Sequence, residues 1–64
     1  MKTLNTYPLN YKGYLININS SQTLTTFLRF EEGTYLYPQC VYYKSLSSIK
    51  KAIDKNIEVY GAIP

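Results

Sequence analysis

The sequence has little of what a catalytic or metal site needs. Among its 64 residues there is no histidine and no tryptophan, and Cys40 is the single cysteine. One cysteine excludes an internal disulfide, and a thiol without histidine cannot complete the set of about four ligands that a structural zinc site requires. Cys40 also lacks the histidine that would activate it as a nucleophile, so we interpret it as a small apolar residue. We expect no metal, no cofactor and no enzymatic activity.

Long apolar stretches and arginine are also scarce. No run approaches the ~18 apolar residues of a membrane span, and no basic and then apolar leader begins the chain. We therefore expect a complete soluble protein of the cytoplasm, without a membrane partner. Arg29 is the one arginine, whereas dedicated DNA binders cluster arginines on their contact surfaces. Seven Lys and Arg against four Asp and Glu give a net charge of +3, which mildly favours acidic partners.

Tyrosine is what the chain has in excess, at eight residues. Its ring is large, rigid and apolar with one polar tip, which suits it to interfaces. A chain this short buries only about 60% of its unfolded surface and usually depends on disulfides, metals or oligomerisation. Because the first two are excluded, binding to itself or to a partner remains. The composition favours surface recognition over catalysis.

The first half of the chain has the alternation of half-buried strands. Residues 1–10 show no periodicity and are predicted to form an N-terminal arm. Residues 11–19 and 23–30 alternate and are predicted to be the first two strands, joined by turn-forming side chains. A third strand is predicted to begin at Thr34 and to be limited by Pro38, followed by an extended piece over residues 40–44.

The pattern then becomes helical. Ser45 is a plausible N-cap, and the side chains of one face follow it. The helix could stop near Lys55 with Asn56 as its cap, or continue through Tyr60 to Gly61. A competing interpretation makes residues 57–60 a fourth short strand, because isoleucine, valine and tyrosine favour strands. The apolar stripe of the shorter helix consists of Leu46, Ile49, Ala52 and Ile53.

The predicted fold class is α+β, a single domain over residues 11–64. It consists of a small antiparallel sheet of three strands, or of four if residues 57–60 are extended, with one C-terminal helix packed on one face. If Glu31-Glu32-Gly33 is a three-residue hairpin loop, Phe30 faces Thr34 and Leu28 faces Leu36. A connection over residues 19–23 likewise pairs Ile18 with Leu24. The face predicted to receive the helix carries Tyr14, Ile16, Ile18, Leu24, Leu28, Phe30 and Leu36.

One helix can cover only one side of such a sheet. The opposite side is predicted to carry a row of Leu15, Phe27 and Tyr37, with Arg29 and Tyr35 beside it. An open apolar patch of this size is a candidate partner-binding surface. The assignment depends on strand register, since a slip of one residue exchanges the two faces.

Charged residues offer a second, weaker candidate. The lysines of the helix region could contact phosphates or an acidic partner, although an ordinary solvated helix face explains them as well. Glu31 and Glu32 are adjacent carboxylates, which we interpret as solvated turn charges and not as an acid and base pair. The candidate basic surface consists of Lys44, Lys50, Lys51 and Lys55.

Residues 11–54 begin with Tyr-Lys-Gly-Tyr-Leu-Ile and end with Ser-Leu-Ser-Ser-Ile-Lys-Lys-Ala-Ile-Asp. This stretch resembles small phage and prophage accessory proteins built as a sheet followed by a helix. The resemblance implies a phage-encoded protein of the host cytoplasm, in a class whose members inhibit host enzymes or defence complexes such as CRISPR effectors. The order of elements is also similar to the arm-binding domains of phage integrases, but the arginine-rich strands of those domains are missing here.

The preferred functional prediction is a non-enzymatic protein-interaction module, phage-encoded, that binds and inhibits or modulates a host protein or associates with itself. The alternative is a small DNA- or RNA-binding protein. In that alternative Phe27, Tyr35 and Tyr37 stack on bases, while Arg29 and the lysines neutralise phosphates.

Overall fold

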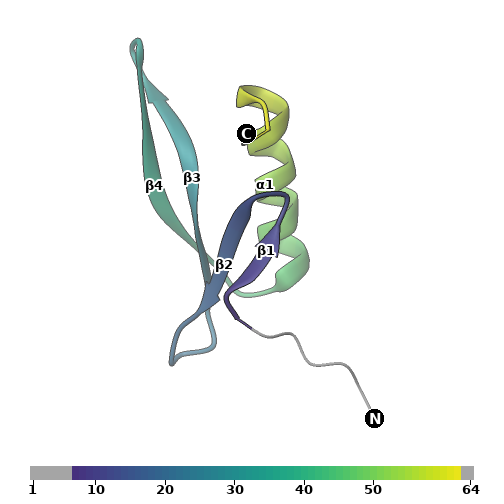
Figure 1. Ribbon diagram of the computed structural model, residues 1–64. Coiled ribbons are helices and arrows are strands. Elements are labelled where there is room, and N and C mark those ends of the chain that lie inside the picture. The colour runs from purple at the N-terminus through teal and green to yellow at the C-terminus, as the bar shows by residue number, and fades with distance from the viewer. Residues whose placement is uncertain (1–6, 63–64) are drawn as a thin grey trace.

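Four strands and one helix follow one another in the computed structural model, which describes residues 7–62 (Figure 1). Each strand pairs antiparallel with the next, so the sheet order is β1-β2-β3-β4. This arrangement confirms the α+β prediction of an antiparallel sheet followed by a C-terminal helix. The elements are β1 (Leu9–Tyr11), β2 (Tyr14–Ile18), β3 (Leu24–Glu32), β4 (Tyr35–Tyr43) and α1 (Leu46–Tyr60).

The first hairpin was not predicted. Lys12 and Gly13 have φ angles of 56° and 92°. Positive φ at both central residues defines the type I′ turn that joins two tightly paired strands. The strand predicted over 11–19 is therefore interrupted, and the sheet starts two residues inside the predicted arm, with Leu9 facing Ile16. The remainder of that arm, apart from the half-buried Tyr7 and the exposed Pro8, lies outside the described residues.

The second hairpin has a shorter turn than predicted. Glu32 faces Tyr35, so only Gly33 and Thr34 connect β3 to β4, and Gly33 has a φ of 63°. Glycine at the first central position suits a two-residue type II′ turn. The predicted three-residue loop is wrong, and Phe30 faces Tyr37 where Thr34 was expected. Because the register differs by an odd number of residues, each β4 side chain lies on the face opposite to the predicted one.

Pro38 does not interrupt β4, although it was expected to limit a strand. It faces Arg29 in the middle of the ladder. The backbone N–H and C=O of Arg29 bond to the side chain of Asn56 and so point away from β4. Residues 29 and 38 are therefore a non-hydrogen-bonded pair, and the missing N–H of Pro38 falls on the outer edge of the sheet. An edge strand tolerates proline in that position.

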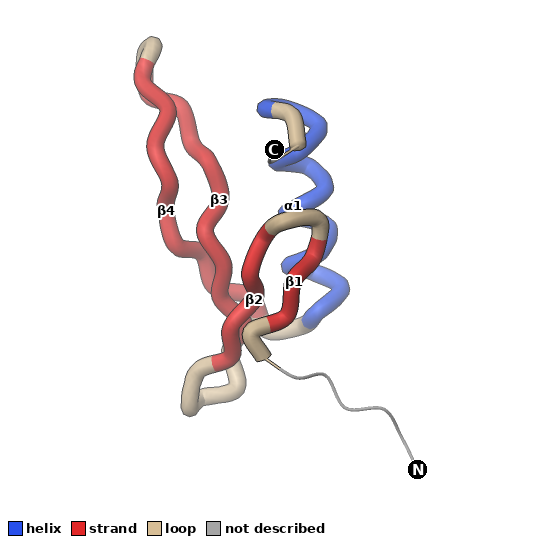
Figure 2. The backbone as a smooth tube through the Cα atoms, in the orientation of Figure 1, coloured by secondary structure: helices blue, strands red, loops and turns tan. Residues whose placement is uncertain are grey.

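The helix follows the longer of the predicted alternatives and excludes a strand at residues 57–60. Ser45 is the N-cap, since its hydroxyl accepts a hydrogen bond from the Ser48 N–H at 3.2 Å. At the other end the Gly61 N–H donates to the carbonyl of Ile57. The helix runs alongside the sheet, and the turn of the β3–β4 hairpin projects beyond the end of α1 (Figure 2).

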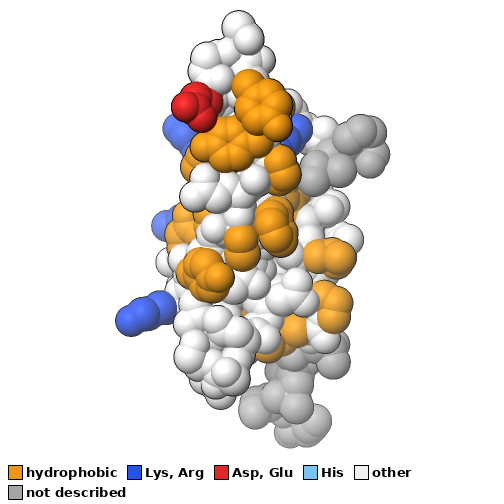
Figure 3. All heavy atoms as spheres, turned by 90° about the vertical axis from the view of Figure 1, so that its left-hand side faces the viewer, with side chains coloured by type: hydrophobic (Ala, Val, Ile, Leu, Met, Phe, Trp, Pro, Cys, Tyr) orange, Lys and Arg blue, Asp and Glu red, His pale blue; other side chains and the backbone are white. Residues whose placement is uncertain are grey.

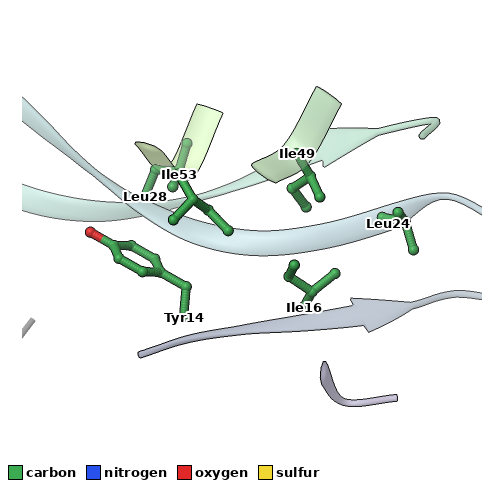
Figure 4. Close-up of a cluster of buried hydrophobic side chains, with 6 residues drawn as sticks. All are labelled: Tyr14, Ile16, Leu24, Leu28, Ile49 and Ile53. Atoms are coloured by element: carbon green, nitrogen blue, oxygen red, sulfur yellow. The ribbon is translucent and has the colours of Figure 1, made fainter. Parts of the chain in front are cut away.

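The core lies between α1 and one face of the sheet (Figure 4). Ile49 and Ile53 of the helix and Ile16 of β2 are fully buried. The predicted core faces of β2 and β3 are confirmed, except that Ile18 is 42% exposed. Leu36, predicted to lie in the core, is on the other side of the sheet. The buried apolar residues are Tyr14, Ile16, Leu24, Leu28, Ile49 and Ile53.

Candidate interaction surface

The side of the sheet that faces away from α1, here called the open face, is largely apolar. Its members follow from alternation along each strand, because the residues between buried positions point the other way. Phe27 and Tyr42 are 62% and 64% exposed, and Leu15 and Leu36 are 52% and 46% exposed. Figure 3 views the molecule from the β4 side and shows hydrophobic side chains along its length. The apolar residues of the open face are Leu15, Phe27, Leu36, Pro38, Cys40 and Tyr42.

A groove of about 380 Å³ marks this face where β2 and β3 diverge. The backbone ladder joins Asn17 to Thr25 and Ile18 to Leu24, as the predicted register required. Next to this ladder, the Thr26 hydroxyl donates to the carbonyl of Leu15 at 2.8 Å. The Thr26 side chain therefore bridges β3 and β2 where the backbone ladder has ended. The groove is lined by Gly13, Tyr14, Leu15, Asn17, Thr26 and Phe27.

Only part of the predicted row is assembled. Leu15 and Phe27 share the open face and line the same groove. Tyr37 faces Phe30, whose ring is 6.3 Å away and packs against the core, so Tyr37 lies on the helix side. Tyr35 stacks on Tyr37 at 5.9 Å and shares that side. The place predicted for Tyr37 in the row is taken by Cys40, which faces Phe27.

The sequence interpretation missed Leu36, Pro38, Cys40 and Tyr42 as members of the open face. Gly33 could have indicated that these residues lie on the open face. A two-residue turn beginning at that glycine sets the observed register, whereas the three-residue loop sets the one that was assumed.

Arg29 was predicted to lie beside the open row, but its guanidinium reaches the end of α1. It donates to the Tyr14 hydroxyl at 2.7 Å and to the carbonyl of Gly61. It also lies 5.8 Å from the centre of the Tyr60 ring. A cation at a helix C-terminus is favoured by the partial negative charge of the last carbonyls. Arg29 therefore connects β3 to the helix and is not free to serve a partner on the open face.

Asn56 completes the same network from the helix. Its side-chain oxygen accepts from the Arg29 backbone N–H at 3.1 Å, and its amide donates to the Arg29 carbonyl at 2.9 Å. The Tyr14 hydroxyl donates to the same oxygen at 3.1 Å. These contacts give β3 the two hydrogen bonds that a neighbouring strand would have supplied. Asn56 is buried, so its polar atoms need these partners.

The four lysines of the predicted basic surface have different surroundings. The Lys50 ammonium lies 5.1 Å from the centre of the Tyr11 ring. Lys55 lines a second groove, of about 300 Å³, between α1 and the β3–β4 hairpin, while Lys44 and Lys51 are exposed. The second groove is lined by Leu28, Arg29, Phe30, Tyr43, Ala52, Lys55, Asn56, Val59 and Tyr60.

An exposed ion pair joins the first turn of the sheet to the helix. The Lys12 ammonium donates to Asp54 at 2.8 Å, and the Tyr11 hydroxyl donates to both oxygens of the same carboxylate. The hydrogen bond from Lys12 lowers the pKa of Asp54, with partial desolvation opposing it, and the bond to Asp54 raises the pKa of Lys12. Both groups remain in solvent, so the pair is a modest support for the fold.

Two further observations concern metals and membranes. Within residues 7–62, side chains able to ligate a metal do not gather in groups of three or more. Over the same residues, no helix has both the length and the apolar character needed to cross a bilayer.

Comparison of the chain with protein-family models, with curated proteins and with solved structures gives no significant match.

Proposed function

We propose that this chain is a non-enzymatic protein-interaction module that binds a protein partner through its open face. The observation that carries the proposal is the exposure of Leu15, Phe27 and Tyr42 on the side of the sheet that α1 leaves uncovered. Contiguous apolar patches on a soluble domain mark interaction sites, and aromatic residues dominate binding energy at such sites.

The narrower form of the proposal names the setting. In it the protein is a phage-encoded accessory protein, and its partner in the host cytoplasm is an enzyme or a defence complex such as a CRISPR effector, which it inhibits or modulates. The support for this form is the resemblance of residues 11–54 to small phage and prophage proteins.

A protein partner is favoured over nucleic acid by the way the aromatic residues are divided. Stacking on successive bases would require Phe27, Tyr35 and Tyr37 on one surface with cations beside them. Phe27 lies on the open face, whereas Tyr35 and Tyr37 lie on the helix side. The guanidinium of Arg29 is engaged by Tyr14 and Gly61. The groups that the nucleic-acid alternative requires are therefore separated.

Affinity capture from a bacterial lysate at moderate salt, with and without nuclease, tests the proposal. We expect Phe27→Ala to abolish capture of a protein partner and nuclease to leave capture intact. Tyr35→Ala is the matched control, because Tyr35 is an aromatic residue of similar exposure on the helix side. Circular dichroism should show both variants folded. Capture that is lost with nuclease, or that depends on Tyr35 and not on Phe27, would contradict the proposal.

A further inference from the structure

We propose that the occupant of the open face is a second copy of this chain, forming a two-fold dimer in which the two sheets stack face to face. This inference rests on the proposed function, because it uses the same face, and it names a second copy as the protein partner in place of the host protein of the narrower form. The sheet edges, the charge of the face and the area that the face offers all favour it.

The outer edge of β4 disfavours the other common way of joining two sheets, which is to pair edge strands. The backbone groups of Leu36, Pro38, Cys40 and Tyr42 point outward, because Pro38 belongs to a non-hydrogen-bonded pair. Pro38 offers no N–H, so a strand added there would lose a hydrogen bond near the middle of the ladder. At the other edge β1 has only three residues. Stacking of faces therefore remains the favoured mode.

The charge of the open face suits self-association. The chain carries a net charge of +3, so two copies repel wherever their charged surfaces meet. A two-fold interface brings each surface patch against the same patch of its partner. The centre of the open face consists of Leu15, Asn17, Thr25, Phe27, Cys40 and Tyr42, none of which is an acidic or a cationic side chain. Glu31 is the acidic residue of the open face and lies opposite Leu36, toward the β3–β4 turn, so it is the centres of two such faces that meet without opposing like charges.

The area of the face reaches what a dimer needs. An aromatic side chain buries about 150 to 250 Å² when it is fully covered, and Phe27 and Tyr42 are 62% and 64% exposed, so with its aliphatic neighbours the face offers on the order of 500 Å² per copy. Two copies would bury about 1,000 Å² in total, which is the lower bound for a specific interface with complementary surfaces and is less than the standard size of about 1,600 Å². Phe27 stands beside the groove between β2 and β3, so a two-fold axis close to Phe27 lets each ring enter the groove of the other copy. The ring and the groove form a self-complementary pair.

The first test is native mass analysis and sedimentation equilibrium over a range of concentrations. We expect a dimer for the natural chain and at least a 30-fold rise, roughly, in its dissociation constant for Phe27→Lys, because a central aromatic acts as a hot spot. Val59→Lys is the matched control, since Val59 is 56% exposed on the helix and the substitution adds the same charge. We expect Val59→Lys to dimerise normally. A natural chain that stays monomeric, or equal losses in the two variants, would overturn the inference.

Cys40 provides a second readout that needs no substitution. It is half-buried in one copy and lies on the open face opposite Phe27, so dimerisation should cover it. We expect alkylation of this thiol to slow as protein concentration rises through the dissociation constant. A constant rate in a chain that dimerises would place the interface elsewhere and overturn the inference.

The outcomes separate this inference from the proposed function. A monomeric chain that still captures another protein through Phe27 overturns the second copy as occupant and leaves the interaction module standing. A monomeric chain without any capture that depends on Phe27 overturns both.

Discussion

The two faces of the sheet are built from similar residues and differ in burial. On the helix side Leu24 and Leu28 are buried against Ile49 and Ile53. On the open face Phe27, one residue before Leu28, is largely exposed. Both sets are apolar, so composition does not distinguish the core from the exposed face here. The difference arises because one helix can cover only one side of a sheet. In a domain this small, an apolar strand residue is a core residue only where another element packs on it.

Replacing a leucine by alanine on each face should give the largest difference in the free energy of unfolding. Leu28→Ala should lower the free energy of unfolding by about 2 to 5 kcal/mol, because it leaves a cavity under the helix. Leu36→Ala removes the same atoms from the open face and should cost less than about 1 kcal/mol. Urea unfolding monitored by circular dichroism, at a protein concentration below any association, measures both. Equal losses would mean that the two faces do not differ as described.

Loss of the Asn56 hydrogen bonds on the helix side should give the next largest effect on stability. Asn56→Ala leaves the Arg29 backbone N–H and C=O without partners and should cost about 1 to 3 kcal/mol in the free energy of unfolding. Asn17→Ala is the control, because Asn17 is exposed on the other face, and it should change stability by less than about 0.5 kcal/mol. If the two variants unfold at the same urea concentration, Asn56 does not take the place of a strand.

The smallest effect should come from the exposed Lys12–Asp54 pair at the rim of the helix side. The lowered pKa of Asp54 means that its stabilisation is present above its unfolded pKa of 3.8 and is lost as pH falls through the folded value. The raised pKa of Lys12 means that its contribution is present below 10.5 and is lost as pH rises through its folded value. The stability difference between the natural chain and Asp54→Asn should therefore be constant near neutral pH and shrink in acid.

Salt and a control residue complete that measurement. High salt should reduce the same difference, because the pair lies in solvent. Glu58→Gln is the control, since Glu58 is exposed and forms no ion pair with any residue between 7 and 62. A Glu58→Gln difference that follows pH in the same way would assign the effect to net charge instead of the pair.

The sequence alone was enough to predict much of the fold. Alternation placed Ile16 and Leu28 in the core and Phe27 opposite to them, and the cap at Ser45 located the helix. Strand β1 was missed because three residues are too few to show alternation. The register of β4 was missed because Gly33 fits two turns of different length, and that choice decides the face of every residue after it.

The position of Arg29 shows a different limit of sequence interpretation. Its place in β3 shares the parity of Phe27, so alternation assigns it to the open face. Its long side chain instead turns around the edge of β3, beyond the end of the β2 ladder, to reach Tyr14 and Gly61. That path exists only because the helix ends beside this edge. The sequence pattern of β3 does not show where the helix ends, so the partners of the Arg29 side chain could be identified only from the tertiary structure.

The amide of Asn56 has a consequence for motion. It holds the backbone of a residue 27 positions earlier in the chain. Fraying of the last helical turns would expose the Arg29 amide to solvent, and separation of the far half of the hairpin would release the helix end. Hydrogen exchange at these two places should therefore share one opening event, so that the hairpin tip and the C-terminal turns open as one cooperative unit.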